Sequence, residues 1–155
     1  MLLFMANAAF AHEYKIGNLE IDHPVARATQ ANAPVSGGYM TIRNNGDQPD
    51  YLIGATAGFA GKVEIHEMKM DGDVMKMREV EGGLEIPAGG EVALKPGGYH
   101  LMFMQLQEQL LTGEKRPATL QFKNAGEVSI EFHVEEIKPG ATMDHSKMGH
   151  TKAAN

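Results

Sequence analysis

Methionine and histidine are the residues of this chain whose types and spacing could do chemistry. The 155 residues include 11 Met and 7 His but no Cys. Without a thiol, the chain cannot form a disulfide, an Fe–S cluster, a cysteine nucleophile or a type 1 blue copper site. Imidazole and thioether groups remain as uncharged donors, and thioethers select soft metals.

Two histidine and methionine segments stand out, the first around an Asp-Gly dipeptide at 71–72. Asp-Gly favours a two-residue hairpin turn. Counting outward from that turn pairs Met68 with Met75 and His66 with Met77, which predicts that their side chains share one face. On the opposite face we expect an ion pair between acidic and basic residues, Glu67 with Lys76.

The second segment is a predicted strand in which His100 and Met102 lie on one face, while Leu101 and Phe103 point into a core. Imidazole and thioether without an anionic ligand suit Cu(I) better than Zn²⁺, Ca²⁺ or Mg²⁺. The alternative for each methionine taken singly is packing, because Met fills irregular gaps in a core. A site without Cys or carboxylate is poor at turnover chemistry, so we expect a carrier of copper and not an enzyme.

The elements that position these residues are predicted to be short strands separated by Gly, Pro, Asn and Asp turns. The candidates are 14–21, 38–44, 51–57, 62–70, 74–80, 91–94, 99–104, 118–123 and 127–137. Only residues 105–111 have the pattern of a helical turn. Many short strands at this spacing predict an all-β Greek-key barrel or sandwich.

The ends of the chain differ from its middle in composition. Residues 1–11 are apolar and end in Ala-Phe-Ala, which predicts an export signal cleaved before His12. Residues 12–137 would then form the β domain, and residues 138–155 a flexible tail rich in Met and His. Export to an oxidising compartment suits a chain without thiols. The net charge of −6 argues against nucleic acid or an anionic membrane as a partner.

The spacing of the candidate ligands is specific. His66 is followed after ten residues by Met77, and after twenty-two more by His100-Leu101-Met102. This pattern resembles the motif of the periplasmic copper chaperone family of the PCu(A)C type, in which the second spacer is one residue shorter. The likeness extends over residues 18–137, and its similar flanking segments are 27–29, 39–44, 63–68, 98–102 and 125–128.

The resemblance implies a cupredoxin-like barrel in the periplasm that binds Cu(I) through His66, Met77, His100 and Met102. It also implies delivery of copper to the binuclear copper centre of the periplasmic subunit of cytochrome c oxidase, beside a thiol-containing partner chaperone.

Six of the remaining methionines belong to two further groups, while Met1 and Met5 lie in the export signal and Met40 in a core strand. An apolar rim around the ion is expected from Met68, Met70, Met75 and Met104. A second, flexible copper site able to take Cu(II) is expected in the tail from Met143, His145, Met148 and His150. His23 and His133 are expected to be surface or structural histidines.

Three other functions compatible with the sequence are open at this point. One is a periplasmic copper buffer for tolerance, in which the tail matters as much as the β domain. The second is a metal-free sandwich that binds proteins through its adaptable methionines. The third is a copper redox enzyme built around His12.

Overall fold

The computed structural model describes residues 13–137, and every regular element in that range is a β-strand. The all-β prediction is therefore confirmed. Within residues 13–137 there is no helix long and apolar enough to cross a membrane. The predicted export signal (1–11), His12 and the tail (138–155), with Met143, His145, Met148 and His150, lie outside the described residues.

The strands occupy most of the predicted segments. Their bounds are β1 Glu13–Ile16, β2 Leu19–Arg27, β3 Val35–Asn44, β4 Asp50–Ala57, β5 Ala60–Asp71, β6 Val74–Glu79, β7 Leu84–Ile86, β8 Glu91–Leu94, β9 Tyr99–Leu106, β10 Lys115–Phe122 and β11 Gly126–Glu135.

Three details of the strand prediction were wrong. The segment 14–21 is two strands, because Gly17 has a φ of 56° and reverses the chain between β1 and β2. The strand β7 was not predicted, because three residues are too few to show alternation. The helical turn expected at 105–111 is absent from the structure, since β9 continues through Gln105, whose φ of 53° lies in the left-handed region.

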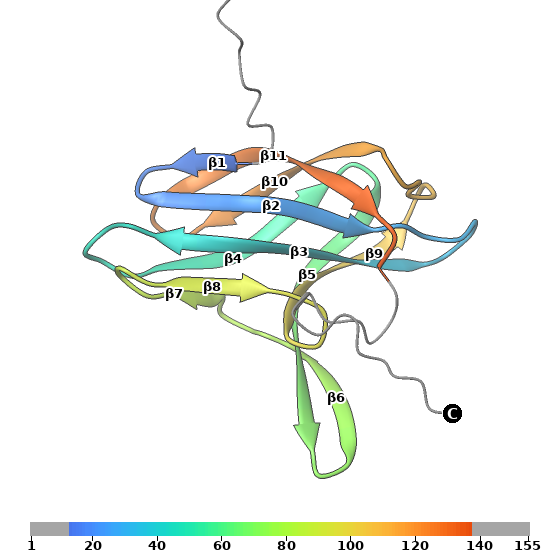
Figure 1. Cartoon of the computed structure of the whole chain (residues 1–155), viewed down its shortest axis with the longest axis horizontal. Helices are drawn as coiled ribbons and strands as arrows, with labels where there is room; N and C mark the ends of the chain where they lie inside the picture. Colours follow the sequence, from blue (N-terminus) through green and yellow to red (C-terminus); the bar gives the residue numbers. More distant parts are fainter. Residues whose placement is uncertain (1–12, 138–155) are drawn as a thin grey trace, which may run out of the picture.

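The strands form one hydrogen-bonded sheet in the order β6-β5-β9-β3-β2-β11-β10-β4-β7, with β1 paired to β2 and β8 paired to β3 (Figure 1). The first half of β3 pairs with β9 and the second half with β8. A single core cluster contains Ile65 of β5, Leu101 of β9, Phe132 of β11 and Ile86 of β7. Residues from opposite ends of the sheet meet in one core, so the sheet curves around it as expected for a barrel or sandwich.

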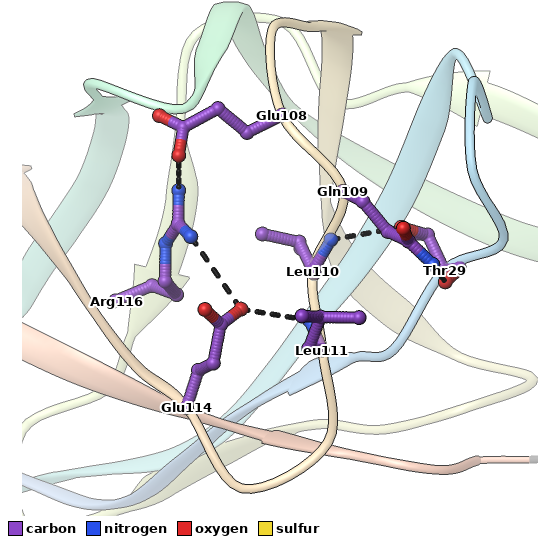
Figure 2. A network of polar contacts seen from close by, with 7 residues as sticks. All are labelled: Thr29, Glu108, Gln109, Leu110, Leu111, Glu114 and Arg116. Carbon is purple, nitrogen blue, oxygen red and sulfur yellow. Dashed lines mark hydrogen bonds and ion pairs between the residues drawn. The ribbon is translucent and has the colours of Figure 1, made fainter.

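The loop that follows β9 is fastened to the end of β2 (Figure 2). Leu110 is fully buried, and its backbone N–H donates to the Thr29 hydroxyl oxygen at 3.0 Å. The Thr29 N–H donates in return to the Leu110 carbonyl at 2.9 Å. Arg116 bridges Glu108 and Glu114 beside this loop. These contacts hold the segment around Thr29, which borders the site described below, against the β-domain.

The hairpin of β5 and β6 projects away from the body of the sheet (Figure 1). Its register corrects the sequence prediction by two residues: Met68 lies opposite Met77, and His66 lies opposite Glu79. The loop consists of residues 72–73 instead of 71–72, because Gly72 with its φ of 66° occupies the first loop position. Since side chains alternate with a period of two, the shift leaves the same residues on the same face.

The charged pairs on the other face of the hairpin also differ from the prediction. Glu67 lies directly opposite Arg78 and forms an ion pair with it at 3.1 Å. Lys76, the expected partner of Glu67, pairs with Asp71 at 2.6 Å.

Candidate metal centre

The candidate site lies on the outer face of β9, on the side of the sheet away from the core. Leu101 and Phe103 point inward and are fully buried in the hydrophobic core. Because side chains alternate along a strand, His100 and Met102 point to the opposite face. The two strands that flank β9 are β5 and β3, so both contribute side chains to the surroundings of these two residues.

His100 forms the floor of the site, and only 5% of its surface is exposed. Its Nδ1 lies 3.1 Å from the Gly98 carbonyl oxygen. A carbonyl can only accept, so Nδ1 carries the proton and Nε2 has a free lone pair. Burial, the main cause, lowers the pKa of His100 below its usual 6.5, aided by the nearby His66 and Arg27. The ring is therefore neutral near pH 7, as a metal ligand must be.

His66 lies directly opposite His100 on β5, with ring centroids 5.8 Å apart. Its Nε2 is 2.8 Å from a Glu64 carboxylate oxygen. A carboxylate also only accepts, so this contact assigns the proton to Nε2. The other ring nitrogen, Nδ1, is buried and has no hydrogen-bond partner. An unpaired buried nitrogen is costly unless something else occupies its lone pair, and a metal ion would do so.

Glu64 holds His66 in place from the same strand. Hydrogen bonds from Lys62 and from His66 lower the pKa of the Glu64 carboxyl group. Glu64 therefore stays ionised and acts as the acceptor that orients the imidazole. Carboxylates that fix the tautomer of a ligating histidine are common around metal sites.

Thioethers line a cavity above His100. The cavity has a volume of about 430 Å³, and its lining includes His100, Met102, Met68, Met75 and Met77. Met77 is 46% exposed, so the cavity is open to solvent on the side of the hairpin. The projecting hairpin thus brings the methionines of β5 and β6 toward those of β9.

The structure brings some predicted residues together and leaves others apart. Of the four expected ligands, Met77, His100 and Met102 line the cavity, while His66 lies beside His100 without lining it. Of the expected rim, Met68 and Met75 line the cavity and Met70 and Met104 do not.

Arg27 and Tyr39 border the cavity and were not assigned a role from the sequence. Arg27 donates from Nη2 to the Tyr39 hydroxyl oxygen at 3.0 Å, and its guanidinium lies 5.8 Å from the centre of the Tyr39 ring. Tyr39 in turn is 6.4 Å from the His100 ring. Gly37 makes this possible, since a Cβ there would lie 2.5 Å from the Tyr39 hydroxyl oxygen. A glycine pair at 37–38 in a strand was the available signal, because strand glycines mark close approach.

The donors that gather here are imidazole nitrogen and thioether sulfur. Within residues 13–137, no group of three or more His, Asp or Glu side chains is placed to hold a metal ion. This mixed set suits a soft monovalent ion.

Comparison with known proteins identifies the family. Residues 19–134 match the family model described as "Putative lipoprotein LpqE-like". The chain belongs to the LpqE-like family.

Solved structures similar to this LpqE-like chain are PCuAC domains. The copper-bound PCuAC domain from PmoF2 has 29% identity, covers 81% of this chain and 99% of its own, and has a TM-score of 0.70. The apo PCuAC domain from PmoF1 has 28% identity, covers 81% and 100%, and has a TM-score of 0.69. The Cu(I) form of DR1885 from Deinococcus radiodurans has 28% identity, covers 88% and 89%, and has a TM-score of 0.61. The LpqE-like chain therefore has the PCuAC fold, as the sequence resemblance implied.

Two sequence relatives are longer than the region they share with this LpqE-like chain. "Putative lipoprotein Lxx21020" of Leifsonia xyli is 29% identical over 107 residues, which are 69% of this chain and 64% of the relative. RP573 of Rickettsia prowazekii is 27% identical over 119 residues, 75% of this chain and 66% of the relative. The chain spans just under two thirds of the length of each relative.

Proposed function

We propose that this LpqE-like protein carries copper and binds one Cu(I) ion through His66, Met77, His100 and Met102. The observation that carries the proposal is the pair of opposed histidines. Each has one ring nitrogen hydrogen-bonded to an acceptor and the other free, beside a cavity lined by methionines. The similar PCuAC domain from PmoF2 is copper-bound, and a structure of DR1885 contains Cu(I).

The donor set supports Cu(I) as the cargo. Thioether sulfur is a soft ligand that selects Cu(I), and neutral imidazole binds copper in either oxidation state. The carboxylate of Glu64, which contacts His66, is already paired with Lys62 and His66. We propose Cu(II) binding only for the predicted second site in the tail.

Because the site is open to solvent, it is better suited to passing the ion to a partner than to storing it permanently. His100 is buried, whereas Met77 is half exposed. An incoming ligand from a partner can reach the ion from the methionine side and replace one thioether at a time. We propose the binuclear copper centre of cytochrome c oxidase as the recipient, assisted by a thiol-containing chaperone. The support for this recipient is the resemblance of the ligand motif to the PCu(A)C family. The lipoprotein names of the relatives support export, and we propose the periplasm as the location.

The site is tested by anaerobic titration of the full chain with Cu(I) against a chromophoric chelator. We expect one tightly bound ion in the wild type. The double variant His66→Ala/Met102→Leu should bind at least about 100-fold more weakly, a loss of roughly 3 kcal/mol. The matched control is Met104→Leu, because Met104 lies on the same face of β9 but outside the cavity. Unchanged affinity in the double variant would rule out this site.

Delivery and buffering predict different phenotypes in cells. If the protein delivers copper, cells without it should lose oxidase activity and tolerate copper normally. Copper sensitivity with normal oxidase assembly would support the buffer alternative. A form without residues 138–155 tests the second copper site by its Cu(II) stoichiometry.

A further inference from the structure

The methionines of the β5–β6 hairpin form two cross-strand pairs. Met68 lies opposite Met77, and Met70 lies opposite Met75 nearer the hairpin loop. Directly opposed residues in an antiparallel pair have Cβ atoms about 4.5–5.5 Å apart, within reach of one shared ion. The four residues share one face of the hairpin and are called the methionine ladder below.

Packing in the core does not account for Met70 and Met75, the outer pair of this ladder. Met70 is 55% exposed and Met75 is 48% exposed, and both are among the large apolar side chains that remain on the surface. In the body of β5 the buried face carries Ile65, but in the hairpin the same face carries charged residues such as Glu67 and Lys69. The methionines of the hairpin are therefore on the face opposite the core.

The ladder is continuous with the candidate metal centre. Met68, Met75 and Met77 line the same cavity as His100 and Met102, whereas Met70 lies outside it. The potential copper ligands therefore form a row that begins at the exposed Met70 beside the hairpin loop and ends at the buried His100. Two carboxylates of β5 and β6 lie on this face, Glu64 and Glu79, and both are at its inner end: Glu64 contacts His66, and Glu79 is opposite His66.

We propose that Met70 and Met75 form an exchange site for Cu(I), which takes the ion from solvent or a partner and passes it along the ladder to the inner His/Met site. This inference rests on the proposed function. The site would take a soft monovalent cation through two thioether sulfurs. The transfer is ligand exchange only: each Cu–S or Cu–N bond that forms on the inner side replaces a Cu–S bond that breaks on the outer side, the copper stays Cu(I), and no proton or electron moves.

The kinetics of exchange test the ladder. Transfer of Cu(I) between a chromophoric chelator, bicinchoninate, and the full-length protein is followed by anaerobic stopped flow in both directions. In the variant Met70→Leu/Met75→Leu, which keeps the apolar volume and removes both sulfurs, uptake and release should each slow about tenfold. Equilibrium affinity should be unchanged, because an intermediate site alters both directions equally. The matched control is Val74→Leu, an exposed apolar change at the same hairpin end.

The other outcomes overturn the inference in distinguishable ways. Unchanged rates in the double variant, with normal wild-type affinity, would refute the exchange site and leave the proposed function intact. Weaker affinity with faster release would show that these methionines belong to the inner site. Failure of the wild type to bind Cu(I) would refute both proposals. The single variants Met70→Leu and Met75→Leu give the same test if the double variant does not fold.

Discussion

At the scale of single residues, the two histidines of the site are prepared for a metal by their hydrogen bonds. Glu64 occupies Nε2 of His66, and the Gly98 carbonyl occupies Nδ1 of His100. Each ring therefore presents its other nitrogen, with the tautomer and the orientation set before the ion arrives. Ligand rings that are held in this way lose less entropy on binding and gain basicity.

Glu64 is a positioning residue, and its removal should weaken binding without removing a ligand. We expect Glu64→Ala to lower Cu(I) affinity about 10–100-fold, because the His66 ring loses its acceptor. Glu64→Gln should restore most of the affinity, since the amide oxygen can still accept from Nε2. Affinity is measured by anaerobic chelator competition. The control Lys62→Ala breaks the ion pair of Lys62 with Glu64 but keeps the Glu64–His66 contact, and an equal loss in that control would contradict the role of Glu64.

At the scale of elements, β3 supports the site through two adjacent glycines that serve opposite faces. Gly37 leaves room for Tyr39 on the outer face, near His100. Gly38 leaves room for the rings of Phe103 and Phe132 in the core. Since β3 pairs with β9 along this stretch, both faces of the strand that carries His100 and Met102 depend on these positions.

A methyl group at Gly38 should destabilise the fold. A Cβ there would lie 2.8 Å from the Phe103 ring and 3.3 Å from the Phe132 ring, and both rings are fully buried. We expect Gly38→Ala to lower the free energy of unfolding by about 1–3 kcal/mol through overpacking. Gly58→Ala is the control, because no atom lies within 4 Å of a Cβ at that position. Urea denaturation measures both, and equal stability of the two variants would contradict the packing argument.

At the scale of the whole molecule, the curved sheet has a dry core on one side and the donor groups on its outer face. The core holds the large apolar side chains, and the outer face of β9 carries His100 under the cavity. His100 is thus an ionisable group that folding removes from water, and this links the stability of the protein to pH.

Acidification should destabilise the metal-free protein. Burial lowers the pKa of His100, so below about pH 6.5 the unfolded chain binds a proton there that the folded chain resists. Hydrogen bonds from Lys62 and His66 lower the pKa of Glu64, which acts in the same direction below about pH 4.5. The free energy of unfolding should therefore fall as the pH drops from 7.5 to 5. His100→Gln should show a shallower fall, and a slope equal to that of the wild type would contradict the role of His100.

The sequence by itself determined which side chains share a face. Strict alternation separates His100 and Met102 from Leu101 and Phe103, and a two-residue error in the hairpin turn left the methionine face unchanged because the side-chain period is two. Only the tertiary structure decided the contacts across strands. The placement of His66 opposite His100, and of Arg27 and Tyr39 at the edge of the cavity, depends on the pairing of β9 with β5 and β3. These pairings join segments far apart in the chain, and local residue patterns carry no information on their register.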